Sequence, residues 1–120
     1  MLFRSSASED GDPKVSHSRI DALRTFIAGH PNDPFPRYAL ALEYKNGNRL
    51  PEARDEFAAL MRDHADYVAA YLHAGNTHLA LGDRTAARET FERGIEASVR
   101  RADGHAQGEL ESALALVSGP

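Results

Sequence analysis

Two stretches of the chain, offset by 34 residues, share one pattern: residues 34–57 read PFPRYALALEYKNGNRLPEARDEF and residues 68–91 read VAAYLHAGNTHLALGDRTAARETF. In each stretch, apolar residues three or four apart form the stripe of one helix, a Gly–Asn or Gly–Asp turn interrupts it, and a second stripe follows. Each stretch is therefore predicted to be two helices joined by a turn. Self-similarity at a fixed step is typical of repeat architectures.

The same 34-residue register extends towards the amino terminus. Residues 18–29 match the second helix of each later pair and are expected to form a single helix without a partner before it. The matching sets are Leu23, Phe57 and Phe91; Ile27, Met61 and Ile95; and the acidic Asp21, Asp55 and Glu89.

Small residues recur where the two helices of a pair are expected to cross. Ala41 and Ala53 occupy these places in one pair, and Gly75 and Ala87 in the other. A larger side chain would push the helices apart. Arg19 stands at the equivalent place in the half repeat, where no preceding helix is expected and bulk is tolerated.

This 34-residue helix-turn-helix unit resembles the tetratricopeptide repeat. The resemblance implies an all-α solenoid of right-handed helical hairpins, similar to small stand-alone bacterial proteins of this type. Leu60, at a usually small position, and Gly47, one residue early in its turn, depart from the pattern and predict a local adjustment. The signature residues are Leu40, Ala41, Tyr44, Ala53 and Phe57 in one unit, and Tyr71, Ala74, Gly75, His78, Gly82, Ala87, Phe91 and Gly94 in the next.

The predicted organisation is a flexible tail over residues 1–16 and one domain over residues 17–120. The domain divides into a half repeat (17–32), two full repeats (33–66 and 67–101) and a capping helix (104–118). The tail is rich in Ser, Gly and acidic residues, which bury too little apolar surface to order a chain. Asp33 and Asp66 are expected to begin the first helices of the two repeats.

Composition excludes several classes of protein. The chain has no cysteine, so disulfides and thiolate metal sites are absent, and a reducing, cytoplasmic location is expected. A net charge of −4 gives no general attraction for nucleic acid. No window approaches the roughly 20 apolar residues that cross a bilayer, and the first residues do not form a secretory signal, so no membrane association is expected.

The spacing of the histidines and the motifs of the sequence give little support for a catalytic or metal site. His73 and His78 are five apart, whereas two ligands on one helix face are three or four apart. No nucleophile elbow or phosphate-binding loop occurs. A histidine-based metal enzyme is therefore the third-ranked hypothesis, and neither catalytic residues, metal nor cofactor are expected. His30 and His64 are interpreted as side chains that meet helix carboxyl ends.

The remaining prediction is a binding surface. The first helix of each repeat lines the concave side of such a solenoid, where peptides or helices of partners are held. The function expected is thus a protein–protein interaction module with an unidentified partner. Alternatives left open are homo-oligomerisation through the same groove, as a scaffold, and a terminal helix that fills the groove. The resemblance places the groove at Phe35, Tyr38, Leu42, Lys45, Asn46, Ala69, Leu72, Asn76 and Leu79.

Overall fold

The computed structural model describes residues 17–119, which form six α-helices and no strand. The prediction of an all-α protein is confirmed. The predicted tail over residues 1–16 lies outside the described residues. The helices are α2 (His17–Gly29), α3 (Pro34–Asn46), α4 (Leu50–Asp63), α5 (Ala69–Ala80), α6 (Arg84–Arg100) and α7 (Gly104–Ser118).

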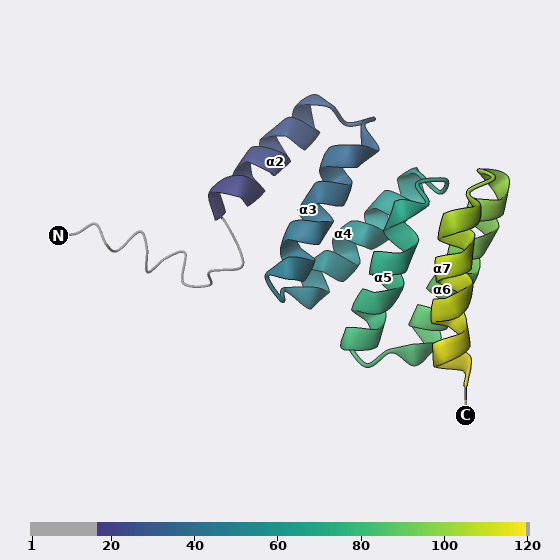
Figure 1. Ribbon diagram of the computed structural model, residues 1–120. Coiled ribbons are helices and arrows are strands. Elements are labelled where there is room, and N and C mark those ends of the chain that lie inside the picture. Colours follow the sequence, from purple (N-terminus) through teal and green to yellow (C-terminus); the bar gives the residue numbers. More distant parts are fainter. Residues whose placement is uncertain (1–16, 120) are drawn as a thin grey trace.

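The helices follow one another in an elongated array of 54 × 36 × 20 Å, with α2 at one end and the pair α6 and α7 at the other (Figure 1). Two hairpins, α3 with α4 and α5 with α6, make up its centre. The first helices also pack on each other, α3 on α5 and α5 on α7, so these three form one layer. Helical hairpins stacked in sequence order define an α-solenoid.

Three of the turns share the same backbone conformation. After α3, α5 and α6, one residue adopts the left-handed conformation, and the next amide donates to the carbonyl five residues earlier. This is the Schellman arrangement that ends many helices. The left-handed residues are Asn48 (φ 62°), Gly82 (φ 84°) and Ala102 (φ 53°). The early glycine of the first hairpin is thus accommodated because Asn48, not Gly47, takes the left-handed place.

Aspartates begin three of the six described helices. The carboxylates of Asp33, Asp83 and Asp103 accept from amides in the first turns of α3, α6 and α7, at 3.0–3.1 Å. The expectation that Asp66 begins the next helix is wrong. Helix α5 starts at Ala69 without a side-chain cap, and the carboxylate of Asp66 instead accepts from Arg100 Nε at 2.8 Å.

The core lies where the helices cross. Ala41, Ala53 and Ala87 are completely buried, as the crossing argument predicts. A Cβ atom on Gly75 would lie 2.2 Å from Cε1 of Phe91, far inside van der Waals contact. The register position of Ala53 and Ala87 holds Arg19 in the half repeat, and the side chain of Arg19 is 67% exposed and binds Glu43 of α3 at 3.1 Å.

The boundaries of the half repeat, the two repeats and the capping helix remain predictions. Helix α2 packs on α3, and Arg24 donates to the hydroxyl of Tyr44 across that contact.

Candidate partner-binding groove

The three first helices line a common cleft. Its volume is about 200 Å³, and side chains from α3, α5 and α7 meet around it. Three predicted groove residues belong to it: Tyr38, Ala69 and Leu72. The lining is completed by Val68, His73, Ala106, Glu109 and Leu110.

Aromatic rings build the floor of this cleft. The ring of His73 lies edge-on to Tyr38, with 5.9 Å between centroids, and parallel to the buried Phe57 at 6.4 Å. Tyr38 also meets Tyr67 at 5.3 Å. Such tilted and offset pairs are the arrangements that aromatic rings prefer. These ring contacts hold the side chains of Tyr38 and His73 in place at the surface that a partner would touch.

Burial controls the ionisation of these rings. It lowers the pKa of His73, and the nearby charge of Lys45 lowers it further, while Glu109 opposes this. His73 is therefore neutral at pH 7. Its Nδ1 atom is buried and has no hydrogen-bond partner among the described residues. Burial, followed by Tyr67, raises the pKa of Tyr38, which keeps its hydroxyl protonated.

The other predicted groove residues lie outside this cleft. Phe35 is 62% exposed, and Asn46 and Asn76 are also exposed. Leu42 and Leu79 are half-buried against the core. Lys45, also half-buried, is close enough to act on His73.

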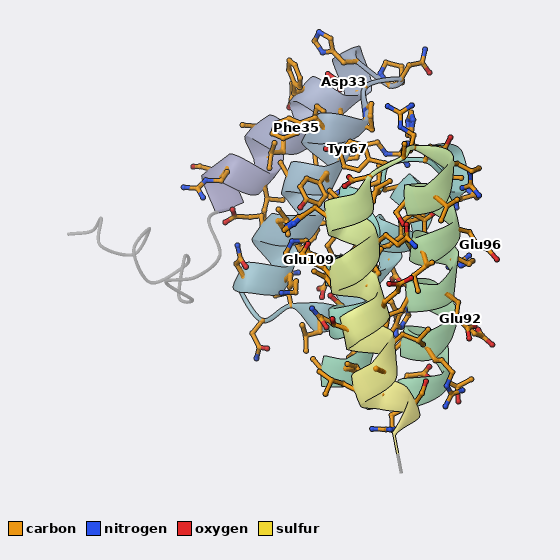
Figure 2. The ribbon with its side chains drawn as sticks, turned by 45° about the vertical axis from the view of Figure 1, so that its right-hand side comes forward. Asp33, Phe35, Tyr67, Glu92, Glu96 and Glu109 are labelled. Atoms are coloured by element: carbon orange, nitrogen blue, oxygen red, sulfur yellow. The ribbon has the colours of Figure 1, made fainter. Side chains whose placement is uncertain are left out.

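Two opposite charges act on the pKa of His73. Lys45 of α3, outside the cleft, lowers it, and Glu109 of α7, which lines the cleft, raises it. Figure 2 shows Glu109 on the side of α7 that faces α3, whereas Glu92 and Glu96 point away from α6 on the other side. A partner segment in this cleft would meet an apolar, aromatic floor beside the carboxylate of Glu109.

Sequence reasoning missed the contribution of α7. The last helix departs from the 34-residue register, so spacing did not show which of its sides borders the groove. His73 was weighed only as a metal ligand. Its position directly after Leu72, in the second turn of a helix that faces the groove, was the signal that would have placed it in the floor.

The terminal helices extend the array. Helix α2 packs on α3, and α7 packs on α6 and α5, so that α7 forms one wall of the cleft. The hypothesis that a terminal helix fills the groove therefore does not hold for α2 or α7 over residues 17–119. Two larger hollows, of about 480 and 410 Å³, are open surface depressions where α3, α5 and α7 begin.

The histidines show no convergent arrangement. In the described part of the chain, no three side chains among His, Asp and Glu come together to hold a metal ion. Nδ1 of His30 lies 3.0 Å from the carbonyl oxygen of Phe26, as expected for a histidine at a helix carboxyl end. His78 is half-buried, and burial lowers its pKa.

The stacked hairpins define the protein as an α-solenoid of the tetratricopeptide type, and comparison with solved structures agrees. The solution structure of a tetratricopeptide repeat domain protein from Salinibacter ruber is 32% identical, with a TM-score of 0.69 over 72% of this chain and 88% of that one. The crystal structure with the same description gives 32% identity and a TM-score of 0.70, over 72% of this chain and 98% of that one.

A protein from Bordetella parapertussis has the same fold, with 24% identity, a TM-score of 0.71 and coverage of 82% of this chain and 86% of that one. No family model matches the sequence, and no curated protein matches it. The chain belongs to the tetratricopeptide repeat family. This fold generally mediates contacts between proteins.

Across residues 17–119, none of the helices combines the length and the apolar character that a membrane span requires.

Proposed function

We propose that the protein is an interaction module that holds a peptide or helix of a partner protein in the groove between α3, α5 and α7. The observation that carries the proposal is the cleft around Tyr38, Leu72 and His73, which α2 and α7 leave open. Half-buried aromatic and aliphatic side chains on a rigid floor are the features of anchor sites in protein interfaces. We also propose that the protein acts by binding and not by catalysis. A cytoplasmic location, expected from the cysteine-free composition, is part of the same proposal.

Affinity capture with a matched pair of variants tests the groove. Ala69→Glu places a carboxylate at the exposed mouth of the cleft, in the first turn of α5, where a negative charge suits the helix dipole. Ala58→Glu makes the same change at an exposed position of α4, which does not line the cleft. Both variants are expected to keep the helical circular dichroism of the wild type.

Proteins captured by the wild type and by Ala58→Glu, but lost with Ala69→Glu, would identify groove partners. Equal capture by all three chains would move the interface away from this cleft. The alternative, self-association through the same groove, predicts that light scattering detects oligomers of the wild type which Ala69→Glu dissociates.

A further inference from the structure

The cleft between α3, α5 and α7 is large enough for one side chain but not for a whole helix. Its volume of about 200 Å³ lies below the roughly 300–1,000 Å³ of pockets that enclose drug-sized ligands. A partner segment that lies in the groove can therefore insert one side chain into the cleft. The lining of the cleft decides which kind of side chain fits.

Apolar side chains make up most of this lining, and the rings of Tyr38 and His73 complete it on α3 and α5. His73 carries no positive charge near pH 7, because burial lowers its pKa. A long aliphatic stem can pack on such a surface, and aromatic rings attract a cation. The apolar members are Val68, Ala69, Leu72, Ala106 and Leu110.

Glu109 is the one carboxylate in the lining of the cleft. Its side chain is half-exposed and lies on the side of α7 that faces α3 (Figure 2). Among residues 17–119, no Lys or Arg forms an ion pair with it. The imidazole of His105 is its one neighbour of this kind, and the distance of 3.7 Å from Nε2 to Oε1 is too long for a hydrogen bond.

This combination of groups favours a positively charged side chain. Glu109 would attract a cation and repel an anion, and the pairing is stronger beside an apolar surface than in bulk water. A purely apolar side chain would displace water from the carboxylate without giving it a new partner. Lys45, the other charged group that acts on His73, belongs to α3 and lies outside the cleft.

We propose that the cleft binds an arginine or lysine side chain of the partner segment, with its aliphatic stem on Leu72 and the rings of Tyr38 and His73 and its charge at the carboxylate of Glu109. The inference rests on the proposed function, because it names the chemistry of the segment that the groove would hold. Arginine suits the cleft better than lysine, since a planar guanidinium stacks on aromatic rings and binds a carboxylate through two hydrogen bonds.

A phage-displayed library of random peptides, selected on the full chain, supplies the probes. Changes in the NMR signals of Tyr38 and Leu72 identify the peptides that bind in the groove. These peptides are expected to share an arginine or lysine. Replacing a shared arginine by its neutral analogue citrulline is expected to weaken binding, because the analogue keeps the shape and loses the charge.

A matched pair of variants tests whether Glu109 receives that charge. Glu109→Gln removes the charge with little change of shape, and Glu92→Gln does the same on α6, where the side chain points away from the groove (Figure 2). Glu109→Gln is expected to weaken binding of an arginine peptide about 3–10-fold in fluorescence anisotropy, whereas Glu92→Gln leaves it unchanged. The citrulline peptide is expected to bind both variants as it binds the wild type.

The mouth of the cleft offers an independent test. Ala69→Glu and Ala69→Lys add long side chains of opposite charge at the same exposed position. Both side chains obstruct the mouth. Ala69→Lys is expected to weaken binding of the arginine peptide more than Ala69→Glu does, because its charge also repels the guanidinium.

Three results would overturn the inference and still leave the groove as the binding surface. One is a set of groove-binding peptides without a shared basic residue, or with a shared acidic one. Another is equal binding of the arginine peptide by Glu109→Gln and Glu92→Gln. The third is a greater loss with Ala69→Glu than with Ala69→Lys. Peptides that bind without changing the signals of Tyr38 and Leu72 would contradict the proposed function itself, so the two failures are distinguishable.

Discussion

Replacement of Gly94 by alanine probes a close contact between α5 and α6. A Cβ atom on Gly94 of α6 would lie 2.5 Å from Cβ of Tyr71 and 3.1 Å from Cδ1 of Leu110. Carbon atoms pack best at about 3.5–4.0 Å, so α5 and α6 would have to separate by roughly 1 Å. Because Cβ of Tyr71 is fixed to the backbone of α5, rotation of the tyrosine ring gives no relief.

The expected magnitude follows from two opposing effects. Overfilling a packed core costs about 1–3 kcal/mol, whereas alanine in place of glycine favours a helix by about 0.8–1.0 kcal/mol. We therefore expect Gly94→Ala to lower the free energy of unfolding by up to about 2 kcal/mol. At about 4–8 °C per kcal/mol for a domain of this size, the melting temperature is expected to fall by up to about 16 °C.

Gly108→Ala is the matched control, because it makes the same change where nothing lies within 4 Å. It is expected to raise the free energy of unfolding by about 0.5–1 kcal/mol. Urea and thermal melts followed by circular dichroism in dilute solution measure both variants. If Gly94→Ala is as stable as Gly108→Ala, the close approach of α5 and α6 is not as tight as described.

Further predictions concern the helix crossing at Ala53, the turn after α6 and the dependence of stability on pH. Ala53→Leu is expected to cost about 1–3 kcal/mol in a urea melt, and the exposed Arg19→Leu less; equal losses would contradict the half-repeat interpretation. Ala102→Gly is expected to add up to about 1 kcal/mol of stability, because glycine relieves the left-handed φ of 53°. Burial lowers the pKa of His73 and His78 in the folded state, so the unfolded state binds more protons below about pH 6.5. Stability is therefore expected to fall as the pH drops below about 6.5, and His73→Gln is expected to flatten that fall.

The fold could be predicted because equivalent residues recur at a regular spacing along the sequence. Residues such as Phe57 and Phe91 occupy equivalent buried places, and the 34-residue step between them is visible without a structure. Where a helix begins depends on whether a nearby aspartate accepts from the amides of that helix or binds a distant side chain instead. The carboxylate of Asp66 binds Arg100, which lies 34 residues away, and this choice leaves no local signature.

The groove could be predicted only in part, because one of its walls belongs to a helix outside the repeat pattern. The resemblance to the tetratricopeptide repeat placed Tyr38 and Leu72 in the groove, whereas Glu109 belongs to the helix that departs from the repeat pattern. Phe26 is exposed because, among the described residues, α2 packs extensively on α3 alone.

The sequential packing of the array also bears on how the chain folds. Each helix packs on the next one in the sequence, and the most distant extensive pairs, α3 with α5 and α5 with α7, are separated by a single helix. Little loop-closure entropy is lost before such contacts form, and proteins dominated by local contacts fold in microseconds to milliseconds. Folding can therefore begin in the central hairpins and spread outwards, and α2, held by one neighbour, would be the helix to detach first when the array loosens.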